Sequence, residues 1–380
     1  MPAPENILIV SASIGSGHLQ AAKAIEKQIQ SQYSHINTHL VDFTAEENSY
    51  LNFFIKEAYL KMINISPNIY DLLYHWTHSS SNINMGNMLA RIMKKSMQRL
   101  IDRYQPDIII CTHPFPCIAA AYLKKLGKTS ATLAAVVTDF AIHKLWVYQQ
   151  VDAYFVAHDE MRASLLAEGI LRERIHVTGI PIIHTNLPFD RQTIIRHMGL
   201  DEKYPIVLLM GGGLGLGGIQ EALNHLNQIQ PVLQLVVVAG KNAALQHSLN
   251  KEAILSTHKV KVLGYAQNIQ EWMACANLLV TKPGALTISE ALTAGLPMLL
   301  YQPIPGQEEE NAAFINSKEA GIWIKKNCQL AKCIETLLDH PDRLAFMKVK
   351  AQKIARPLAA FDIIKILVMN DDQHSKAAGI

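Results

Sequence analysis

Two short stretches of this sequence combine glycine with side chains that can move protons or hold anions. The first is SIGSGH at Ser13 to His18, where a histidine follows a glycine turn at the expected start of a helix. The positive end of a helix dipole disfavours imidazolium, so this imidazole is expected to stay neutral and to serve as a base. A surface or capping histidine without chemistry fits the same position, and both interpretations stay open.

The second stretch, Thr281 to Asn311, reads TKPGALTISEALTAGLPMLLYQPIPGQEEEN. Pro283 and Gly284 break a strand, and a helix is expected to begin near Thr287. Thr287 and Glu290 have the T-x-x-E spacing of a capping box, which is common at helix starts. The same start offers unpaired amides and a positive dipole end, which suit an anion such as a pyrophosphate. An ordinary capped helix and a ligand site therefore both fit.

Apolar runs bounded by glycine, proline and polar residues predict alternating strands and helices. Six strands are expected in the first half of the chain and six in the second: residues 7–12, 38–43, 107–111, 132–138, 152–157 and 175–178, then 205–210, 233–239, 259–263, 277–281, 296–301 and 321–325. Ligands of open α/β sheets collect at the carboxyl ends of the strands. His18, His113 and Asp139 follow such strands and are expected to converge on one crevice.

This alternation predicts an α/β protein built from two doubly wound, Rossmann-like domains that face a central cleft. We expect an N-terminal domain over residues 1–178, a linker over 179–203, a C-terminal domain over 204–356 and a final helix over 357–371 that packs back on the N-terminal domain. The glycine-rich run at 211–218 follows the first strand of the second domain, where bare backbone can approach a phosphate closely.

Composition limits the classes of function. The 380 residues are 49% hydrophobic and 18% charged, as in a packed globular protein, and a net charge of +3 is too small to indicate nucleic acid as a partner. An anionic membrane surface is compatible with this charge. The five cysteines lack zinc-site spacing, so no metal is expected. No signal or transit peptide is visible, and no apolar run is long enough to span a bilayer.

The region between residues 50 and 103 differs in character from the rest. Aromatic and methionine side chains recur there at helical spacing beside lysine and arginine, at 50–65, 69–76 and 85–103. Such helices suit a bilayer interface or an apolar acceptor groove. Ordinary core helices have the same pattern, so both interpretations stay open.

Four motifs carry a resemblance to a known family. They are ILIVSASIGSGH at 7–18, CTHPFP at 111–116, VVTDFAIHKLW at 136–146, and TKPGALTISEAL with GLPMLLY and PGQEEENA at 281–312. Together they resemble the monogalactosyldiacylglycerol synthases, with the bacterial processive diacylglycerol glucosyltransferases as the most similar branch. The resemblance implies a GT-B fold of glycosyltransferase family 28, inverting transfer, a nucleotide-sugar donor in the second domain and a lipid acceptor in the first.

The resemblance also implies roles for single residues. His18 would be the general base, with Asp139 orienting or charging it, and Trp146 and the aromatic residues at 51–76 would serve acceptor and membrane. On the donor side, Glu290 would hold the ribose hydroxyls and Tyr265 and Ala266 would flank the uracil. The remaining donor contacts would be Gly212, Gly213, Lys241, Gly284, Ala285, Leu286 and Thr287 for the phosphates, and Gln307, Glu308 and Asn311 for the sugar. Glu310 and Asn277 depart from the family pattern, where glycine and aspartate are expected.

Together these expectations describe a hexosyltransferase that uses a UDP-sugar as donor and inverts the anomeric configuration. It would need neither a metal nor a cofactor. It would move glucose, or alternatively galactose, onto diacylglycerol to make a glycolipid, as a cytoplasmic protein peripheral to the cytoplasmic face of the cell membrane. An undecaprenyl-lipid-linked N-acetylglucosaminyltransferase of the same superfamily is the nearest rival, although the PGQEEEN loop argues against it. A regulator that binds nucleotide sugars without catalysis and a same-fold epimerase are two further rivals.

Overall fold

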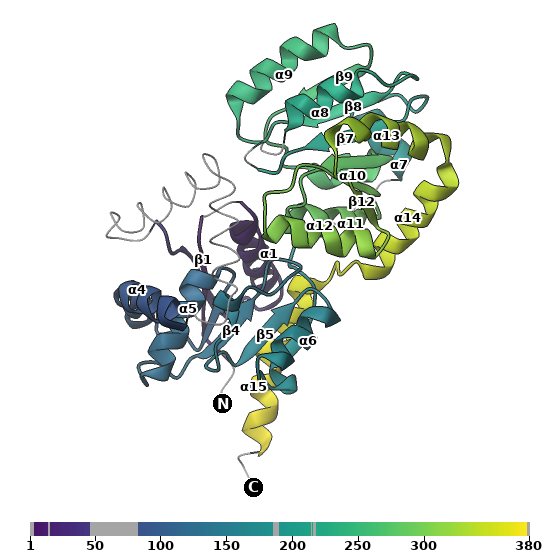
Figure 1. The fold of residues 1–380 in the computed structure, drawn as a ribbon. Coiled ribbons are helices and arrows are strands. Elements are labelled where there is room, and N and C mark those ends of the chain that lie inside the picture. Colours follow the sequence, from purple (N-terminus) through teal and green to yellow (C-terminus); the bar gives the residue numbers. More distant parts are fainter. Residues whose placement is uncertain are drawn as a thin grey trace. The chain divides into compact units, whose positions relative to one another are not determined.

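The computed structural model describes residues 4–13, 16–45, 83–184, 190–213, 215 and 218–377 (Figure 1). The chain divides into two compact units. The first comprises Met1–His184 together with Pro357–Ile380, and the second comprises Thr185–Arg356. Each unit contains one six-stranded sheet, and each is described by itself.

The first unit has a wholly parallel sheet in the order β2-β1-β3-β4-β5-β6. Its strands are β1 (Asn6–Ser11), β2 (Asn37–Asp42), β3 (Ile108–Cys111), β4 (Thr132–Val136), β5 (Ala153–Val156) and β6 (Ile175–Val177). The chain places β2 on one side of β1 and all later strands on the other side. The topological switch point, where open α/β sheets bind ligands, therefore lies between β1 and β3.

Helices cover both faces of this sheet, which explains why its central strands are apolar without alternation. The helical segments are α1 (Gly17–Gln32), α4 (Ile83–Tyr104), α5 (Pro114–Lys125), η1 (Lys144–Trp146), α6 (Asp159–Ala167), η2 (Arg172–Arg174) and α15 (Ala359–Ala377). Ile25 and Ile29 of α1 and Ile363 of α15 share one buried cluster with Ile7 and Ile9 of β1. The last helix of the chain is therefore part of the core of the first unit.

The second unit repeats this plan with a parallel sheet in the order β12-β11-β10-β7-β8-β9. Its strands are β7 (Ile206–Met210), β8 (Gln234–Val238), β9 (Lys259–Leu263), β10 (Leu278–Thr281), β11 (Met298–Leu300) and β12 (Gly321–Trp323). The chain runs outward from β7 to β9 and then returns to β10 on the other side of β7. The switch point of this sheet therefore lies between β7 and β10.

The helices of the second unit also lie on both faces of its sheet (Figure 1). They are α7 (Arg191–His197), α8 (Ile219–Leu226), α9 (Ala243–Leu255), α10 (Ile269–Cys275), α11 (Ala285–Ala294), α12 (Gln307–Ser317), η3 (Asn327–Gln329), α13 (Leu330–Asp339) and α14 (Pro341–Ile354). Leu223 of α8 and Ile334 of α13 share one buried cluster with Val207 and Leu209 of β7. This packing fixes the strand ends that carry the loops of the candidate site.

All twelve predicted strands are present, with ends that differ from the prediction by no more than two residues. The stretch 179–203, predicted as a linker, includes α7, which Asp190 caps by accepting a hydrogen bond from the Thr193 amide. Ile194 and Ile195 bury its inner face. Because α7 is short, its few apolar residues do not show a clear helical period in the sequence.

The predicted membrane-facing segment at 51–76 lies outside the described residues, whereas α4 covers the predicted helix at 85–103. Among the described helices, none combines the length and the apolar character that crossing a bilayer requires.

Candidate active site

His18 lies at the switch point of the first sheet, as the second residue of α1. Its Nδ1 is 3.0 Å from the carbonyl oxygen of Thr112, which follows β3, and 2.6 Å from Oγ1 of Thr138, which follows β4. The Thr112 hydroxyl donates in return to the His18 carbonyl at 3.1 Å. Residues from two neighbouring strand ends, those of β3 and β4, therefore hold the imidazole ring.

These contacts determine which ring nitrogen of His18 carries the hydrogen. The Thr112 carbonyl can only accept, so Nδ1 must donate and Nε2 must carry the lone pair. The Thr138 hydroxyl also donates to that carbonyl, at 3.3 Å, which leaves its oxygen free to accept from Nδ1. Among the described residues, the hydrogen bonds of the His18 ring are those at Nδ1. The arrangement thus presents an imidazole lone pair at Nε2.

His18 is neutral over the physiological pH range. Burial lowers the pKa of His18 to about 4, although the bond with the Thr112 carbonyl works in the opposite direction. A neutral imidazole whose other nitrogen is fixed by a backbone carbonyl is the form in which histidine accepts a proton from a hydroxyl group.

A second histidine packs against His18. The ring of His113 makes a T-shaped contact with the His18 ring, with centroids 4.6 Å apart and planes at 74°. His113 is the N-cap of α5, and its Nδ1 accepts a hydrogen bond from the Phe115 amide at 3.1 Å. Burial, and secondly the proximity of His18, lower the pKa of His113, so this ring is neutral as well.

Asp139, predicted as the partner of His18, is 8% exposed and lies one residue beyond Thr138. Its role stays a prediction, because the bonds that orient His18 come from Thr112 and Thr138. Sequence reasoning missed these two threonines, although both follow strands whose carboxyl ends meet at one edge. Trp146 was expected to face acceptor and membrane, but it is 1% exposed and belongs to the core.

At the switch point of the second sheet, α11 begins earlier than predicted. Its N-cap is Gly284, without a side-chain hydrogen bond, so the predicted capping box of Thr287 and Glu290 is wrong. The Gly284 carbonyl already accepts from the Ile288 amide at 3.0 Å, which closes the first turn at Ala285. Thr287 lies inside this first turn and Glu290 in the middle of the helix.

The early start leaves the amides of Ala285, Leu286 and Thr287 without acceptors inside α11. These donors point out of the helix start, where the dipole is positive. Glu290, one turn further on, is partly exposed and has no hydrogen-bond partner among the described residues. Burial raises the pKa of its carboxyl group to about 7. Hydrogen bonds donated to the Glu290 carboxyl group, for example by ribose hydroxyls, would favour its ionised form.

Lys282 is a functional candidate that sequence reasoning missed. It follows β10 directly and forms a mostly buried ion pair with Glu308. A Cβ built on Gly284 would lie 3.5 Å from the Lys282 ammonium, and one on Gly212 would lie 3.4 Å from Cε. The lysine therefore lies between the start of α11 and the loop after β7. It brings a positive charge to the switch point of the second sheet.

Glycine allows two neighbouring loops to meet beside Lys282. Gly240, which has a φ of +63°, approaches the loop after β7 so closely that a Cβ would lie 2.7 Å from the Gly213 carbonyl and 2.8 Å from the Gly212 carbonyl. Lys241 then donates its amide to Gly213 O at 3.0 Å. Its ammonium lies 5.4 Å from the ring centroid of Tyr265, which is 47% exposed.

Ala266 follows Tyr265 in the loop after β9 and is partly exposed. The structure therefore brings Lys241, Tyr265 and Ala266 to adjacent strand ends, and their contacts with the donor stay predictions.

The acidic loop is organised differently from the expectation. Gln307 is the first residue of α12, and the Glu309 carboxylate accepts from the Gly306 amide at 3.3 Å, which caps this helix. Glu308, besides its pair with Lys282, accepts from the Ile304 amide at 3.0 Å. Asn311 is 0% exposed and donates to Pro283 O at 3.1 Å. The Asn311 amide therefore holds the turn before α11, and its predicted contact with sugar hydroxyls stays a prediction.

Within the described residues, no group of three or more His, Cys, Asp or Glu side chains is placed to hold a metal ion.

Comparisons with known proteins agree with this geometry. Residues 18–182 match the family described as monogalactosyldiacylglycerol (MGDG) synthase, and residues 206–361 match the glycosyltransferase family 28 C-terminal domain. A processive diacylglycerol beta-glucosyltransferase of Bacillus cytotoxicus is 33% identical over 372 residues, which cover 97% of this chain and 94% of the relative.

Solved structures at lower identity share the fold. MurG of Acinetobacter baumannii superposes with a TM-score of 0.61 at 16% identity, covering 97% of this chain and 100% of that one. UDP-GlcNAc 2-epimerase of Neisseria meningitidis, bound to UDP-GlcNAc, gives 0.60 at 13% identity, covering 96% and 100%.

Two Rossmann-like units with this sheet topology define the GT-B glycosyltransferase fold, as predicted. The chain belongs to the family of the monogalactosyldiacylglycerol synthases and processive diacylglycerol glucosyltransferases, and it is a glycosyltransferase. The resemblance drawn from the four sequence motifs is thereby confirmed.

Proposed function

We propose that this protein is an inverting glycosyltransferase that transfers a hexose from a UDP-sugar to diacylglycerol. One observation carries the proposal. The imidazole of His18 is neutral, and its Nδ1 is bonded at the switch point of the first sheet, so the lone pair of Nε2 is available to accept a proton. The name of the Bacillus relative, which matches nearly the whole chain, supports diacylglycerol as acceptor and favours glucose over galactose.

In the proposed reaction, the acceptor hydroxyl oxygen attacks the anomeric carbon from the face opposite the diphosphate. The new carbon–oxygen bond forms as the bond to UDP breaks, and UDP leaves with the electron pair. Nε2 of His18 takes the hydroxyl proton. Because Nδ1 donates to a backbone carbonyl, the imidazolium that forms keeps this bond, which stabilises the charge that the ring acquires.

The donor would bind at the carboxyl edge of the second sheet. The diphosphate meets the three first-turn amides of α11 and the Lys282 ammonium, which together stabilise the leaving group. Glu290 accepts from the ribose hydroxyls, and Tyr265 and Ala266 flank the uracil. Glu308 and Gln307 lie at the start of α12, where they would form hydrogen bonds with the sugar hydroxyls. Asn311 supports this site by holding Pro283 O.

The start of α8, which follows β7, is another helix terminus near this edge, and it is already occupied. A Cβ at its N-cap, Gly218, would collide with the Gln302 carboxamide oxygen. Glu221 in its first turn accepts hydrogen bonds from Gln302 Nε2 at 2.6 Å and from Asn327 Nδ2 at 2.8 Å. A carboxylate at this place repels a second anion. The diphosphate is therefore assigned to α11, with Gly212 and Gly213 as neighbouring backbone.

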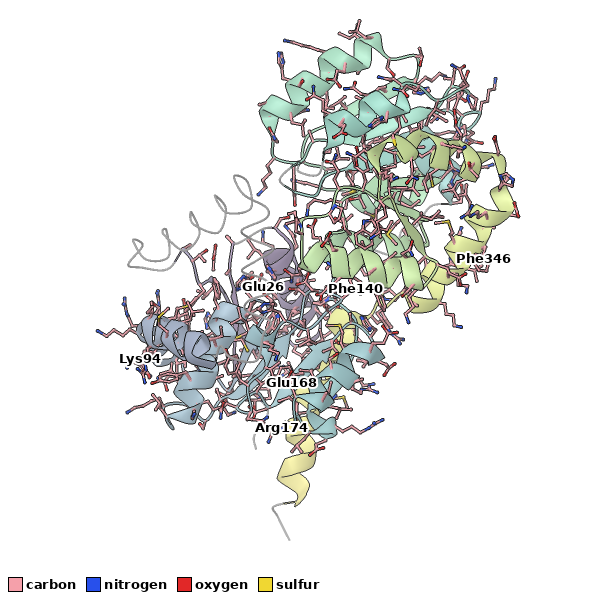
Figure 2. The ribbon with its side chains drawn as sticks, in the orientation of Figure 1. Glu26, Lys94, Phe140, Glu168, Arg174 and Phe346 are labelled. Carbon is pink, nitrogen blue, oxygen red and sulfur yellow. The ribbon has the colours of Figure 1, made fainter. Side chains whose placement is uncertain are left out.

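The proposal includes peripheral contact with an anionic membrane at its cytoplasmic face. On α4, Met88 and Ile92 are 56% and 39% exposed. Lys95 and Arg99 continue the same helical stripe at the next two turns, and Arg91 lies beside it. Figure 2 shows basic side chains, Lys94 among them, extending from α4. Exposed apolar side chains flanked by lysine and arginine suit the headgroup region of an anionic bilayer.

An assay with diacylglycerol vesicles tests the function. The protein is incubated with radiolabelled UDP-glucose, UDP-galactose or UDP-N-acetylglucosamine, and the product lipids are separated. We expect labelled glycosyldiacylglycerol from UDP-glucose. If no donor labels the lipid, the proposal is wrong. The same assay separates the rivals that share the fold, since an epimerase would convert UDP-N-acetylglucosamine without any lipid.

A further inference from the structure

The hydrogen position on His113 is fixed by its bond to the chain. A backbone amide always donates, so the Nδ1 that receives the Phe115 amide at 3.1 Å carries no hydrogen. The ring is neutral, because burial and then the proximity of His18 lower its pKa. Its one hydrogen is therefore on Nε2. Among the described residues, the hydrogen bond of this ring is the one at Nδ1.

His18 has the opposite tautomer. It donates through Nδ1 to Thr112 O and presents a lone pair at Nε2, whereas His113 presents an N–H at the equivalent atom. The two rings touch, with centroids 4.6 Å apart. Two neutral imidazoles in contact thus offer one acceptor and one donor, and each tautomer is enforced by backbone rather than by solvent.

This pair of groups matches one kind of ligand atom. A hydroxyl oxygen donates one hydrogen bond and accepts others, so it can donate to His18 Nε2 while it accepts from His113 Nε2–H. With hydrogen bonds of about 2.9 Å, one oxygen can bridge two nitrogens up to about 5.8 Å apart. Ring centroids at 4.6 Å are compatible with such a bridge. An ether or ester oxygen has no hydrogen and would bind to His113 alone.

We propose that His113 is a positioning residue for the acceptor: its Nε2–H donates to the hydroxyl oxygen whose proton is taken by His18. This inference rests on the proposed function and adds a residue to it. The bond from His113 fixes the oxygen beside the base and directs a remaining lone pair, which then attacks the anomeric carbon. His113 also caps α5, so the variants must separate the two roles.

Two substitutions make this separation. In His113→Asn, the short side chain keeps an oxygen that can accept from the Phe115 amide, as asparagine does at N-caps, but it has no group at the place of Nε2. In His113→Gln, the longer side chain carries an N–H close to the place of Nε2 but lacks the favourable capping geometry. Transfer to diacylglycerol, thermal stability and UDP affinity are measured for both variants and for the wild type.

We expect the two variants to show opposite defects. His113→Asn keeps the melting temperature and the UDP affinity of the wild type, while its kcat/KM for diacylglycerol falls by about 10- to 100-fold. His113→Gln melts about 2 to 4 °C lower but transfers within about 10-fold of the wild type. If a normally folded His113→Asn transfers as fast as the wild type, His113 is only a cap and the inference is wrong. A wild type without any transfer would instead contradict the proposed function.

A measurement on the wild type guards against variants that fail to fold. Nitrogen-15 NMR of protein labelled at histidine distinguishes protonated from unprotonated ring nitrogens. We expect His113 protonated at Nε2 and His18 protonated at Nδ1 at neutral pH. A hydrogen on Nδ1 of His113 would overturn the inference, whatever the variants do.

Discussion

The two switch points of this molecule have the same topology but opposite chemistry. Between β1 and β3, His18, Thr112 and His113 form a neutral cluster whose ring nitrogens are bonded to the backbone and to the Thr138 hydroxyl. Between β7 and β10, the mostly buried Lys282 and three first-turn amides without an acceptor inside α11 meet glycine loops. The fold supplies the crevice in both units. In the proposed function, the side chains beyond the strand ends decide whether the crevice takes up a proton or binds an anion.

Burial acts differently at the two switch points. In the first unit, burial lowers the pKa of both histidines, which favours the uncharged rings. In the second unit, the mostly buried Lys282 forms an ion pair with Glu308. A site for proton transfer needs a group that changes charge during the reaction, whereas a site for a diphosphate needs a group that is charged before the ligand arrives.

The largest expected effect comes from removing the lone pair in the first unit. His18→Asn keeps an N–H that can donate to Thr112 O but removes Nε2. We expect kcat for lipid transfer to fall by about 100- to 10,000-fold, the usual contribution of a general base. UDP affinity, measured by calorimetry, should not change, since the donor contacts lie in the other unit. Loss of transfer and UDP binding together would show that His18 is structural.

The second largest effect tests the charge in the other unit. Lys282→Met should weaken UDP binding by about 10- to 100-fold, because a charge-assisted contact to the diphosphate is lost. Binding of uridine, which lacks phosphate, should change little. This variant also leaves Glu308 buried without its partner, so the double variant Lys282→Met, Glu308→Gln should restore stability but not UDP affinity.

Lys241→Met serves as a matched control, because Lys241 follows β8, two strands away from β10 in the same sheet, and its ammonium lies over the Tyr265 ring. We expect it to weaken UDP binding less than Lys282→Met does. The opposite order would assign the diphosphate to the loops after β7 and β8 instead of the start of α11.

A third, smaller effect is the pH dependence of donor binding. Burial raises the pKa of Glu290 to about 7 in the free protein. Ribose hydroxyls that donate to its carboxylate stabilise the ionised form and lower this pKa. UDP binding should therefore strengthen as pH rises from about 5 to about 8, by on the order of 10-fold, with release of a proton near pH 6.

Calorimetry in buffers with different ionisation enthalpies measures this proton release. Glu290→Gln has no ionisable group at this position, so its UDP affinity should be weaker and should not follow this pH dependence. An unchanged UDP affinity in Glu290→Gln, at every pH, would remove Glu290 from the donor site.

The strands and the general positions of both sites could be predicted from sequence, because buried parallel strands are short apolar runs followed by glycine or polar residues. The start of α11 could not. T-x-x-E at Thr287 and Glu290 is a local pattern that suggests a helix start at Thr287, whereas the helix already begins after Gly284. The partners of His18 were also beyond prediction: Thr112 becomes a neighbour through the pairing of Val10 with Cys111 across the sheet. Asn311 meets Pro283 for a similar reason, through tertiary packing.

The last prediction extends the comparison from the crevices to the surface. If the first unit handles the lipid, the membrane contact should lie on it, at the stripe of Lys95 and Arg99 on α4. Each basic residue near an anionic surface contributes about 1 kcal/mol, so Lys95→Glu with Arg99→Glu should weaken vesicle binding by at least about 10-fold. Flotation with vesicles of anionic phospholipid measures it.

The control is Lys332→Glu with Lys348→Glu, the same charge change at two exposed lysines on α13 and α14 of the second unit. It should leave flotation nearly unchanged. Since both double variants lower the net charge equally, a general electrostatic attraction would weaken both alike. Equal losses would therefore contradict a membrane face on α4, while a loss confined to the α4 variant would place the lipid contact on the unit that carries His18. Raising the salt concentration should abolish that difference, because only the electrostatic part of the attraction is screened.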